Sequence, residues 1–315
     1  MLRIYFLQQW FNLSDPQAED AIYDSESMRR FARVELGDEA VPDETTILRF
    51  RHLLEQHGLT QAIFNSITGL LEERRLLLRS GTIVDATIIA APSSTKNASA
   101  ARDPEMKQTR KGRNWHFGMK LHVGTDQRGI VHTVRATAAS VADITQLPDL
   151  LHGQERELFG DQAYWKEDDR KFLEAWGMRY RVNRRPTSQR PLSKRWRMIN
   201  RARSRTRARG EHAFRVVKQL WGFAKVRYRG LAKNLARADH VCARQSLPGP
   251  STTAPGRDQV PTVRKLMVAS SLCGDHRCRN HHSSFVPGPD CYNCFSQSLP
   301  NTDLCRPSLG ACSRF

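Results

Sequence analysis

The chain has 315 residues, enough for two modest domains, and its 50 Lys and Arg against 32 Asp and Glu give a formal net charge of +18. This excess predicts a polyanionic partner, because Lys and Arg gain affinity by displacing counterions from phosphates. No apolar run is long enough to span a bilayer, and the apolar opening is interrupted by Arg3 and followed by no signal-peptide cleavage site. We therefore expect a cytoplasmic protein with no membrane partner.

Charge and cysteine are both unevenly distributed. Residues 1–78 hold thirteen Asp or Glu and eight Arg, whereas residues 179–209 hold thirteen Lys or Arg and no acid. This asymmetry suggests that one part of the chain contacts nucleic acid and another part does other work. All seven cysteines lie between Cys242 and Cys312. The character of the sequence therefore changes near residue 240.

Residues 1–78 predict a small all-helical domain. Apolar residues recur at helical spacing from about residue 4 to residue 31, with Ser14 as a helix cap. A second helix is expected to begin at Asp43 and to stop at Gly58, and a third to follow it.

Residues 79–238 predict a mixed α/β domain. The expected elements are strand 81–91, polar loop 92–114, a hairpin of strands 115–126 and 130–140, a short helix 143–151, strand 157–165, helix 166–177, strand 178–183 and long helix 194–222. This order predicts a mixed sheet with flanking helices and at least one right-handed crossover.

Residues 239–315 predict a low-order tail, because Pro, Gly and Ser are frequent and no helical or strand periodicity persists. Four of its cysteines invite a zinc interpretation: Cys273, Cys278, Cys291 and Cys294. The first two are separated by four residues instead of two, and no packed framework is expected around them, so we do not favour a zinc site.

Three carboxylates stand out in the α/β domain. Asp85 lies inside an apolar strand and Asp161 near the end of another, where a charge is costly unless it is paired, exposed or bound to a cation. Glu211 follows the basic segment, and helical spacing puts it on one face with Arg207 and Lys218. Each Asp alone is more often an edge-strand acid or a cap, and the helix face alone is a surface ion-pair ladder.

Taken together, the three carboxylates can hold two Mg²⁺ ions, which prefer oxygen ligands and share them with substrate phosphates. Such a site can activate a water or a 3′-hydroxyl for in-line displacement at phosphorus. Neighbouring cations would hold the DNA backbone, and three tryptophans are candidates for stacking on bases if they are not buried: Trp115, Trp196 and Trp221. We expect His116 and His122 to serve in packing or phosphate contact.

Several ordered motifs resemble the DDE transposases of bacterial insertion sequences, specifically the IS-five group: "GTIVDATII", "WHFGMKLHVGTD", "FGDQAYW" and "RARGEHAFRVVKQLWGFAKVRYRGLAKN". The segments "LQQWFNLSDPQAEDAIYDSESMRRF" and "PDETTILRFRHLLEQHGL" resemble the N-terminal domain of that group. The resemblance covers nearly all of residues 1–238. It implies that the family's N-terminal domain has further residues before Met1, so the chain is expected to be shortened there.

The resemblance implies an RNase H-like fold and assigns roles residue by residue. Asp85, Asp161 and Glu211 match the catalytic residues, which are also the metal ligands for Mg²⁺, with Mn²⁺ as a substitute. Around Glu211 the family has a signature of Tyr, Arg, Glu and Lys; Arg207 and Lys218 match it and are implied to contact DNA, whereas Ser204 stands where Tyr is expected. The implied partners are double-stranded DNA and further copies of the chain.

Three other cations are expected to contact the DNA backbone: Arg203, Arg209 and Lys120. Two other functions stay open at this stage. A non-catalytic DNA-binding remnant or transposition inhibitor would keep the DNA surface without the chemistry. A basic RNA-binding protein would not need the three carboxylates in one site.

The tail has a further interpretation. One choice of codons for residues 239–253, read one base later, encodes "TMFALANLYLARRRL", an amphipathic helix with a basic end that resembles the terminal helix of this transposase group. We therefore expect residues from about 239 onward to be out-of-frame translation, which accounts together for the cysteines, the lost periodicity and the Pro/Ser-rich composition.

Overall fold

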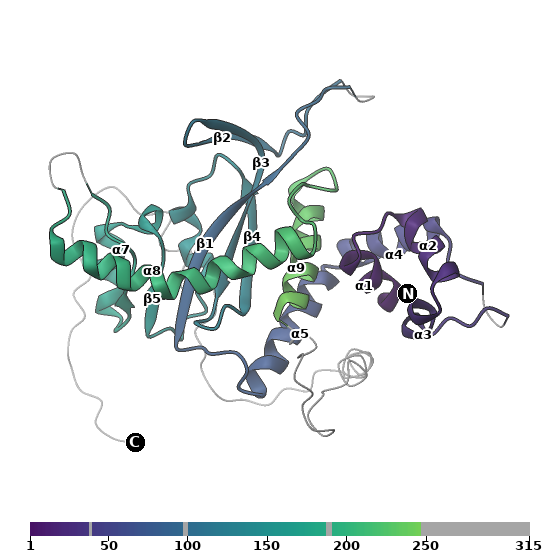
Figure 1. The fold of residues 1–315 in the computed structure, drawn as a ribbon, viewed down its shortest axis with the longest axis horizontal. Coiled ribbons are helices and arrows are strands. Elements are labelled where there is room, and N and C mark those ends of the chain that lie inside the picture. The colour runs from purple at the N-terminus through teal and green to yellow at the C-terminus, as the bar shows by residue number, and fades with distance from the viewer. Residues whose placement is uncertain (38–39, 97–99, 187–190, 247–315) are drawn as a thin grey trace, which may run out of the picture. The chain divides into compact units, whose positions relative to one another are not determined.

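A six-stranded mixed sheet forms the centre of the fold in the computed structural model, which describes residues 1–37, 40–96, 100–186 and 191–246 (Figure 1). Its strands are β1 (Gly81–Ala90), β2 (Lys107–Lys111), β3 (Asn114–Thr125), β4 (Val131–Ala138), β5 (Glu157–Phe159) and β6 (Arg179–Tyr180). β1 pairs antiparallel with β3, and β3 pairs antiparallel with β4. On the other edge of β1, β5 and then β6 run parallel to it.

The strand path β4-β3-β1-β5-β6 confirms the expected RNase H-like mixed sheet with flanking helices. The sequence folds this way because β1, β3 and β4 are rich in apolar and β-branched residues, which fit a buried pleated surface. β5 and β6 are short because only their apolar residues are covered.

Helices cover both faces of the sheet. α5 (Leu59–Glu73), α8 (Lys194–Arg215), the π-helix η3 (Val216–Leu220) and α9 (Leu231–Ser246) share one apolar cluster with β1, β3 and β4. α6 (Leu147–Leu150) and α7 (Glu167–Ala175) pack in a second cluster with β5 and β6. Ile89 belongs to the first cluster and Val84 to the second, as expected for residues of opposite parity on one strand. Two 3₁₀ turns, η1 (Asp143–Gln146) and η2 (Gln162–Tyr164), complete this half.

The N-terminal helices follow the expected start signals. They are α1 (Leu2–Trp10), α2 (Asp15–Asp24), α3 (Glu26–Ala32) and α4 (Glu44–Gln56). Ser14 caps α2 in a capping box with Gln17, and Asp43 caps α4 through the Thr46 amide. Gly58 follows the end of α4 and is the N-cap of α5, with a left-handed φ of 60°. None of the helices in the described part of the chain is long and apolar enough to cross a membrane.

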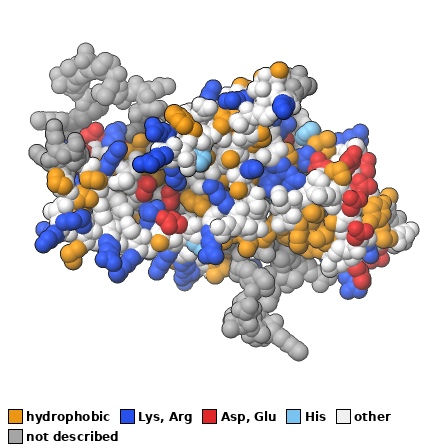
Figure 2. Space-filling model, turned by 45° about the horizontal axis from the view of Figure 1, so that its top comes forward, with side chains coloured by type: hydrophobic (Ala, Val, Ile, Leu, Met, Phe, Trp, Pro, Cys, Tyr) orange, Lys and Arg blue, Asp and Glu red, His pale blue; other side chains and the backbone are white. Residues whose placement is uncertain are grey.

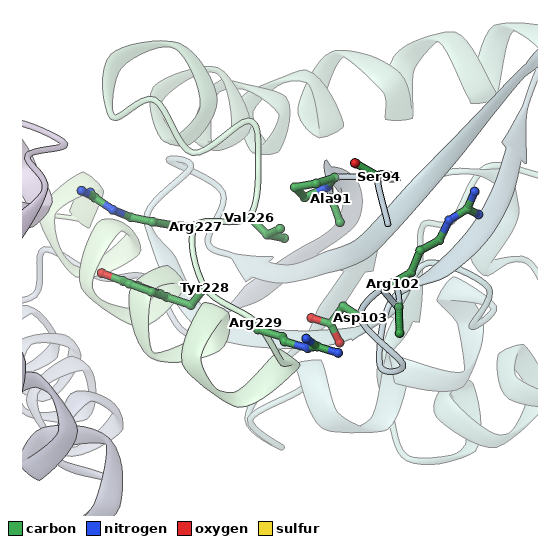
Figure 3. Close-up of a pocket in the computed structure, with 10 residues that line it drawn as sticks. Ala91, Ser94, Arg102, Asp103, Val226, Arg227, Tyr228 and Arg229 are labelled. Carbon is green, nitrogen blue, oxygen red and sulfur yellow. The ribbon is translucent and has the colours of Figure 1, made fainter. Parts of the chain in front are cut away.

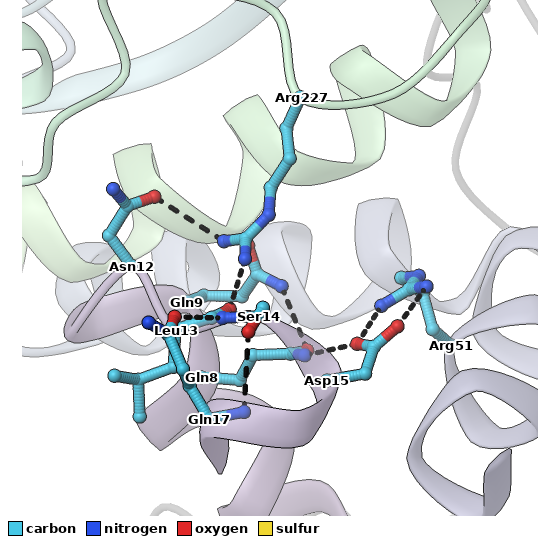
Figure 4. Close-up of polar contacts among 9 residues, drawn as sticks. All are labelled: Gln8, Gln9, Asn12, Leu13, Ser14, Asp15, Gln17, Arg51 and Arg227. Atoms are coloured by element: carbon cyan, nitrogen blue, oxygen red, sulfur yellow. Dashed lines mark hydrogen bonds and ion pairs between the residues drawn. The ribbon is translucent and has the colours of Figure 1, made fainter. Parts of the chain in front are cut away.

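Polar contacts join the first helices to the chain before α9 (Figure 4), and one further contact joins them to α9 itself. Arg227 donates to Asn12 Oδ1 at 3.3 Å and to the Leu13 carbonyl, and Arg237 donates to the same Asn12 oxygen at 2.6 Å. Asp15 accepts from both terminal nitrogens of Arg51, at 2.6 and 2.9 Å. Residues 1–78 and the sheet accordingly pack together within one compact unit.

The structure corrects three expectations. β2 lies inside the segment expected to be a polar loop, because it is an edge strand with five polar residues and gives no apolar alternation. β5 ends at Phe159, since the chain then turns into η2. The boundary expected after residue 238 is placed too early, because α9 continues to Ser246 and buries Val241 and Cys242. The rest of the expected tail, including its candidate zinc cysteines, lies outside the described residues.

Candidate active site

The parallel pairing of β1 and β5 brings the two aspartates to one level. Ile83 stands opposite Phe159 in this ladder, and Asp85 and Asp161 each follow two residues later. Asp85 lies within β1 with its side chain 15% exposed. Asp161 caps η2 by accepting from the Ala163 amide at 2.8 Å. The middle of β1 and the turn just after the parallel strand β5 therefore supply the two acids.

Glu211 reaches this level from α8. The helix can approach β1 closely because residue 210 is glycine: a Cβ there would lie 2.9 Å from Ile83 Cγ2 and 3.3 Å from Thr125 Oγ1. The carboxylate that follows is half-exposed, with 52% of its side chain accessible. α8 thus places the solvent-exposed carboxylate of Glu211 near β1, the strand that contains Asp85.

Arg207 connects two of the three acids. Its Nη1 donates to Asp85 Oδ2 at 3.2 Å, and its Nη2 lies 2.6 Å from Glu211 Oε1. The Arg207 side chain is 22% exposed, so these pairs are shielded more than ordinary surface ion pairs. The surface ladder considered from the sequence therefore exists in part, but it turns inward to the β1 aspartate.

The electrostatics join all three carboxylates. Burial is the largest cause that raises the pKa of Asp85 to about 6, and the charges of Asp161 and Glu211 raise it further. The Ala86 amide and Arg207 act in the opposite direction. Carboxylates that repel one another in a partly buried place are arranged to hold a cation or a proton.

The chemistry of the three side chains suits a divalent cation. All three are carboxylates, and Mg²⁺ and Mn²⁺ take oxygen ligands. Their mutual repulsion around Asp85 is the structural sign of that fit. Within the described residues, however, no three His, Cys, Asp or Glu side chains already stand at metal-binding distances. Arg207 occupies the place between Asp85 and Glu211, so cation binding requires a shift of these side chains.

The basic residues expected to contact DNA take different positions. Lys218 lies in η3, a π-helix of the kind often found at functional sites, and its Nζ donates to the Ile88 carbonyl at 2.7 Å. Burial, and then the charge of Lys111, lower the pKa of Lys218. Arg209 is exposed and donates to the Gln127 carbonyl at 3.0 Å. Figure 2 shows how Lys and Arg side chains spread over the face of the molecule that it presents.

The side chains of Arg203 and Lys120 make contacts within the protein. Arg203 donates to the Val182 carbonyl at 2.6 Å and lies over the Trp196 ring at 5.6 Å. Lys120 pairs with Asp143 at 2.9 Å and donates to the Val141 carbonyl at 2.7 Å. It stands opposite Ile88 in the ladder, so the alternation of the strand puts it on the sheet face away from Asp85.

Other sequence candidates divide into packing and surface residues. His122 is fully buried and shares a hydrogen bond of 2.8 Å with the Thr137 hydroxyl, which confirms packing as its role. Trp221 packs against the first apolar cluster, whereas Trp115 is 67% exposed. Ser204, where the family signature has Tyr, accepts a hydrogen bond of 2.9 Å from the Asn183 side chain.

Two residues near the site were missed from the sequence. Tyr164 is buried beside the aspartates, and burial followed by the charges of Asp143, Asp85 and Asp161 raises its pKa. Lys111 approaches Lys218 from β2. Tyr164 could have been found from its spacing of three residues after Asp161, but nothing in the polar segment around Lys111 indicated that it folds back toward α8.

Comparison with known proteins gives matches to two family models. A family model described as Transposase DDE domain matches residues 77–243, and one described as Transposase domain (DUF772) matches residues 1–53. Among solved structures, the Mos1 strand transfer complex is 15% identical with a TM-score of 0.23, over 78% of this chain and 77% of that chain. The Mos1 mariner paired end complex with Mn is 14% identical with a TM-score of 0.21, over 67% and 77%. Since the first family model covers more than half of the sequence, the chain belongs to the family of proteins with a transposase DDE domain.

Proposed function

We propose that the protein is a transposase that cleaves and joins DNA at the ends of an insertion sequence of the IS-five group, by metal-dependent phosphodiester hydrolysis followed by strand transfer. One observation carries the proposal: Asp85 lies beneath the basic helix α8, close enough to Asp161 and Glu211 for their negative charges to raise its pKa. Such a group of acids is out of place on a surface made only to bind phosphates, because it repels them.

Each residue has a role in this proposal. Asp85, Asp161 and Glu211 hold the catalytic cations, with Mg²⁺ as the cofactor and Mn²⁺ as its substitute. When bound, such cations activate the attacking water or 3′-hydroxyl and stabilise the leaving oxygen. Arg207, which pairs with Asp85 and Glu211, would face the substrate phosphate when cations are bound. Lys218 and the exposed Arg209 neutralise the backbone on either side.

The partners follow from the same chemistry. Double-stranded DNA provides the phosphates for the 50 Lys and Arg of the chain. We further propose that the protein acts in the cytoplasm as a homo-oligomer, since two element ends must be held together for joining.

A nicking assay tests the proposal. Supercoiled plasmid is incubated with the protein in Mn²⁺ or Mg²⁺, and open-circular product is measured beside DNA binding by fluorescence anisotropy. Asp161→Asn keeps an acceptor for the Ala163 amide but loses the charge, so nicking should fall at least about a hundredfold while binding persists. Asp168→Asn, an exposed acid on α7, is the matched control and should nick as the parent does. Equal nicking by Asp161→Asn overturns the assignment.

A second function is favoured by a specific observation. The described residues hold no ready metal-binding group, and Arg207 already neutralises two of the acids. An inactive DNA-binding remnant or transposition inhibitor would show this arrangement permanently. In the same assay such a protein binds plasmid without nicking it in either metal.

A further inference from the structure

The hairpin of residues 107–116, here called the basic ribbon, projects its polar residues into solvent. It comprises β2, a turn at Gly112 with a φ of 62°, and the first residues of β3. Four cations and no acid occur in it: Lys107, Arg110, Lys111 and Arg113. All four are exposed. A two-stranded ribbon with one sign of charge is a surface made for a polyanion.

The base of the ribbon is anchored firmly. Met106, just before it, is buried, and a Cβ at Gly118, just after it, would lie 2.1 Å from the Ile89 carbonyl oxygen. The preceding segment is tied to the start of α9, where Asp103 accepts from the Gly230 amide at 2.7 Å. Asp103, Arg102 and Arg229 line a cavity of about 210 Å³, and Figure 3 shows Asp103 beside Arg229. A ribbon held at its root keeps its tip in a defined place.

The ribbon lies close to the candidate active site. Lys111 is near enough to Lys218 to act on its ammonium group, and Lys218 bonds to the carbonyl of Ile88, three residues after Asp85. Two like charges from distant parts of the chain repel each other unless an anion lies between them. A phosphate that bridges Lys111 and Lys218 would link the ribbon to the carboxylates.

The tip carries an exposed aromatic side chain. Trp115 is 67% exposed and stands opposite Arg110 in the ladder. Val123, the partner of Asp85, lies eight positions further along β3. At roughly 3.3 Å per residue this is at most about 26 Å, or about eight base pairs of duplex.

We propose that the basic ribbon enters the major groove of duplex DNA within about eight base pairs of the cleaved bond, its four cations on the phosphates and Trp115 on base edges. A major groove admits a two-stranded ribbon of this width. The inference rests on the proposed transposase function, because it takes the carboxylates as the point of cleavage. It adds a second DNA contact outside α8.

The test compares variants by fluorescence anisotropy on a labelled 40-base-pair duplex at several salt concentrations. Replacement of Lys107, Arg110, Lys111 and Arg113 by Gln should weaken binding by at least about tenfold and flatten the salt slope by about two or more, since each lost phosphate contact removes about 0.9. The control replaces four exposed arginines elsewhere by Gln and removes the same charge: Arg33, Arg49, Arg74 and Arg75. It should change the DNA affinity and the salt slope less.

Trp115 is tested separately. Trp115→Ala should weaken binding about tenfold, and Trp115→Phe should restore most of it. Trp176→Ala removes the other strongly exposed tryptophan, which is 74% accessible just after α7, and should have no effect. Thermal melting shows that each variant is folded. If the ribbon variants bind like the parent, the ribbon proposal is overturned while plasmid nicking still supports the function; if Asp161→Asn nicks, the proposed function fails instead.

Discussion

Arg207 donates to Asp85 across 3.2 Å although 122 positions separate the two residues in the chain. The same guanidinium holds Glu211, so a side chain of the protein supplies the positive charge between two acids. A resident cation of this kind keeps carboxylates together before another cation arrives, and it must give way for that cation to bind.

Loss of this guanidinium should therefore strengthen cation binding in DNA-free protein. Arg207→Gln leaves Asp85 and Glu211 with a net charge more negative by one, and we expect Mn²⁺ to bind about tenfold more tightly. Isothermal calorimetry measures this directly. Arg205→Gln removes an exposed charge from the same helix and should change the affinity by much less. Weaker Mn²⁺ binding by Arg207→Gln would show that Arg207 organises the acids instead of competing for them.

Gly210 should tolerate no side chain, although alanine is normally the better helix former. The added methyl would meet Ile83 Cγ2 at 2.9 Å in a fully buried place, so Gly210→Ala should lower the free energy of unfolding by about 1–3 kcal/mol. Gly69→Ala on α5 has open space and should raise it by about 1 kcal/mol. Urea titration of both variants gives the comparison, and equal gains would contradict the close packing of α8 on β1.

Replacement of His240 by methionine should stabilise the protein. Its ring packs on Phe6 and Tyr5 at 4.5 and 4.6 Å, but neither ring nitrogen has a hydrogen-bond partner among the described residues. His240→Met removes both unpaired nitrogens and keeps the aromatic contacts, so the free energy of unfolding should rise by about 1–3 kcal/mol.

The gain should depend on pH. Burial lowers the pKa of His240 to about 3, so its contribution is present above the ordinary histidine pKa and is lost as the pH falls below about 6.5. The advantage of His240→Met should accordingly be larger at pH 5.5 than at pH 7.5 in urea titrations. Under the codon choice considered for residues 239–253, the expected alternative reading frame would place Met at this position. A destabilised methionine variant would argue against that frame.

The contribution of Asp239 to the free energy of unfolding should change with pH in the opposite direction to that of His240. Burial raises the pKa of Asp239 to about 7, and the charge of Arg135 acts in the opposite direction. Because the folded-state pKa lies above the unfolded one, the contribution of Asp239 is full below about pH 4 and is lost as the pH rises through 7. Asp239→Asn should match the parent near pH 4 and exceed its stability by on the order of 3 kcal/mol at pH 8. Asp20→Asn, an exposed acid on α2, should show no such divergence.

The sequence was most informative where one residue type determines local structure. Apolar β-branched residues predicted β1 and the β3–β4 hairpin, and Ser14 and Asp43 marked the helix starts. Asp85 and Asp161 were notable because a charge in such a strand needs a reason, and their matching register in parallel strands now gives one.

Other features depend on contacts that no local pattern encodes. Lys120 was expected to contact DNA, but whether it faces the acids depends on the parity of β3 against β1, which fixes it beside Asp143 on the other face. β2 is held by pairing with β3 and not by burial, so its composition resembles a loop. The inward turn of Arg207 likewise depends on how closely α8 approaches the sheet.

The placement of α9 has a consequence for the order of folding. This last described helix packs against α5, α1 and β4, and its Arg237 bonds to Asn12. The helices made first on the ribosome therefore lack their main packing partner until residues 231–246 have emerged. Contacts this distant in sequence slow folding and leave apolar surface open during synthesis. The nascent chain should thus depend on chaperones until α9 closes the core.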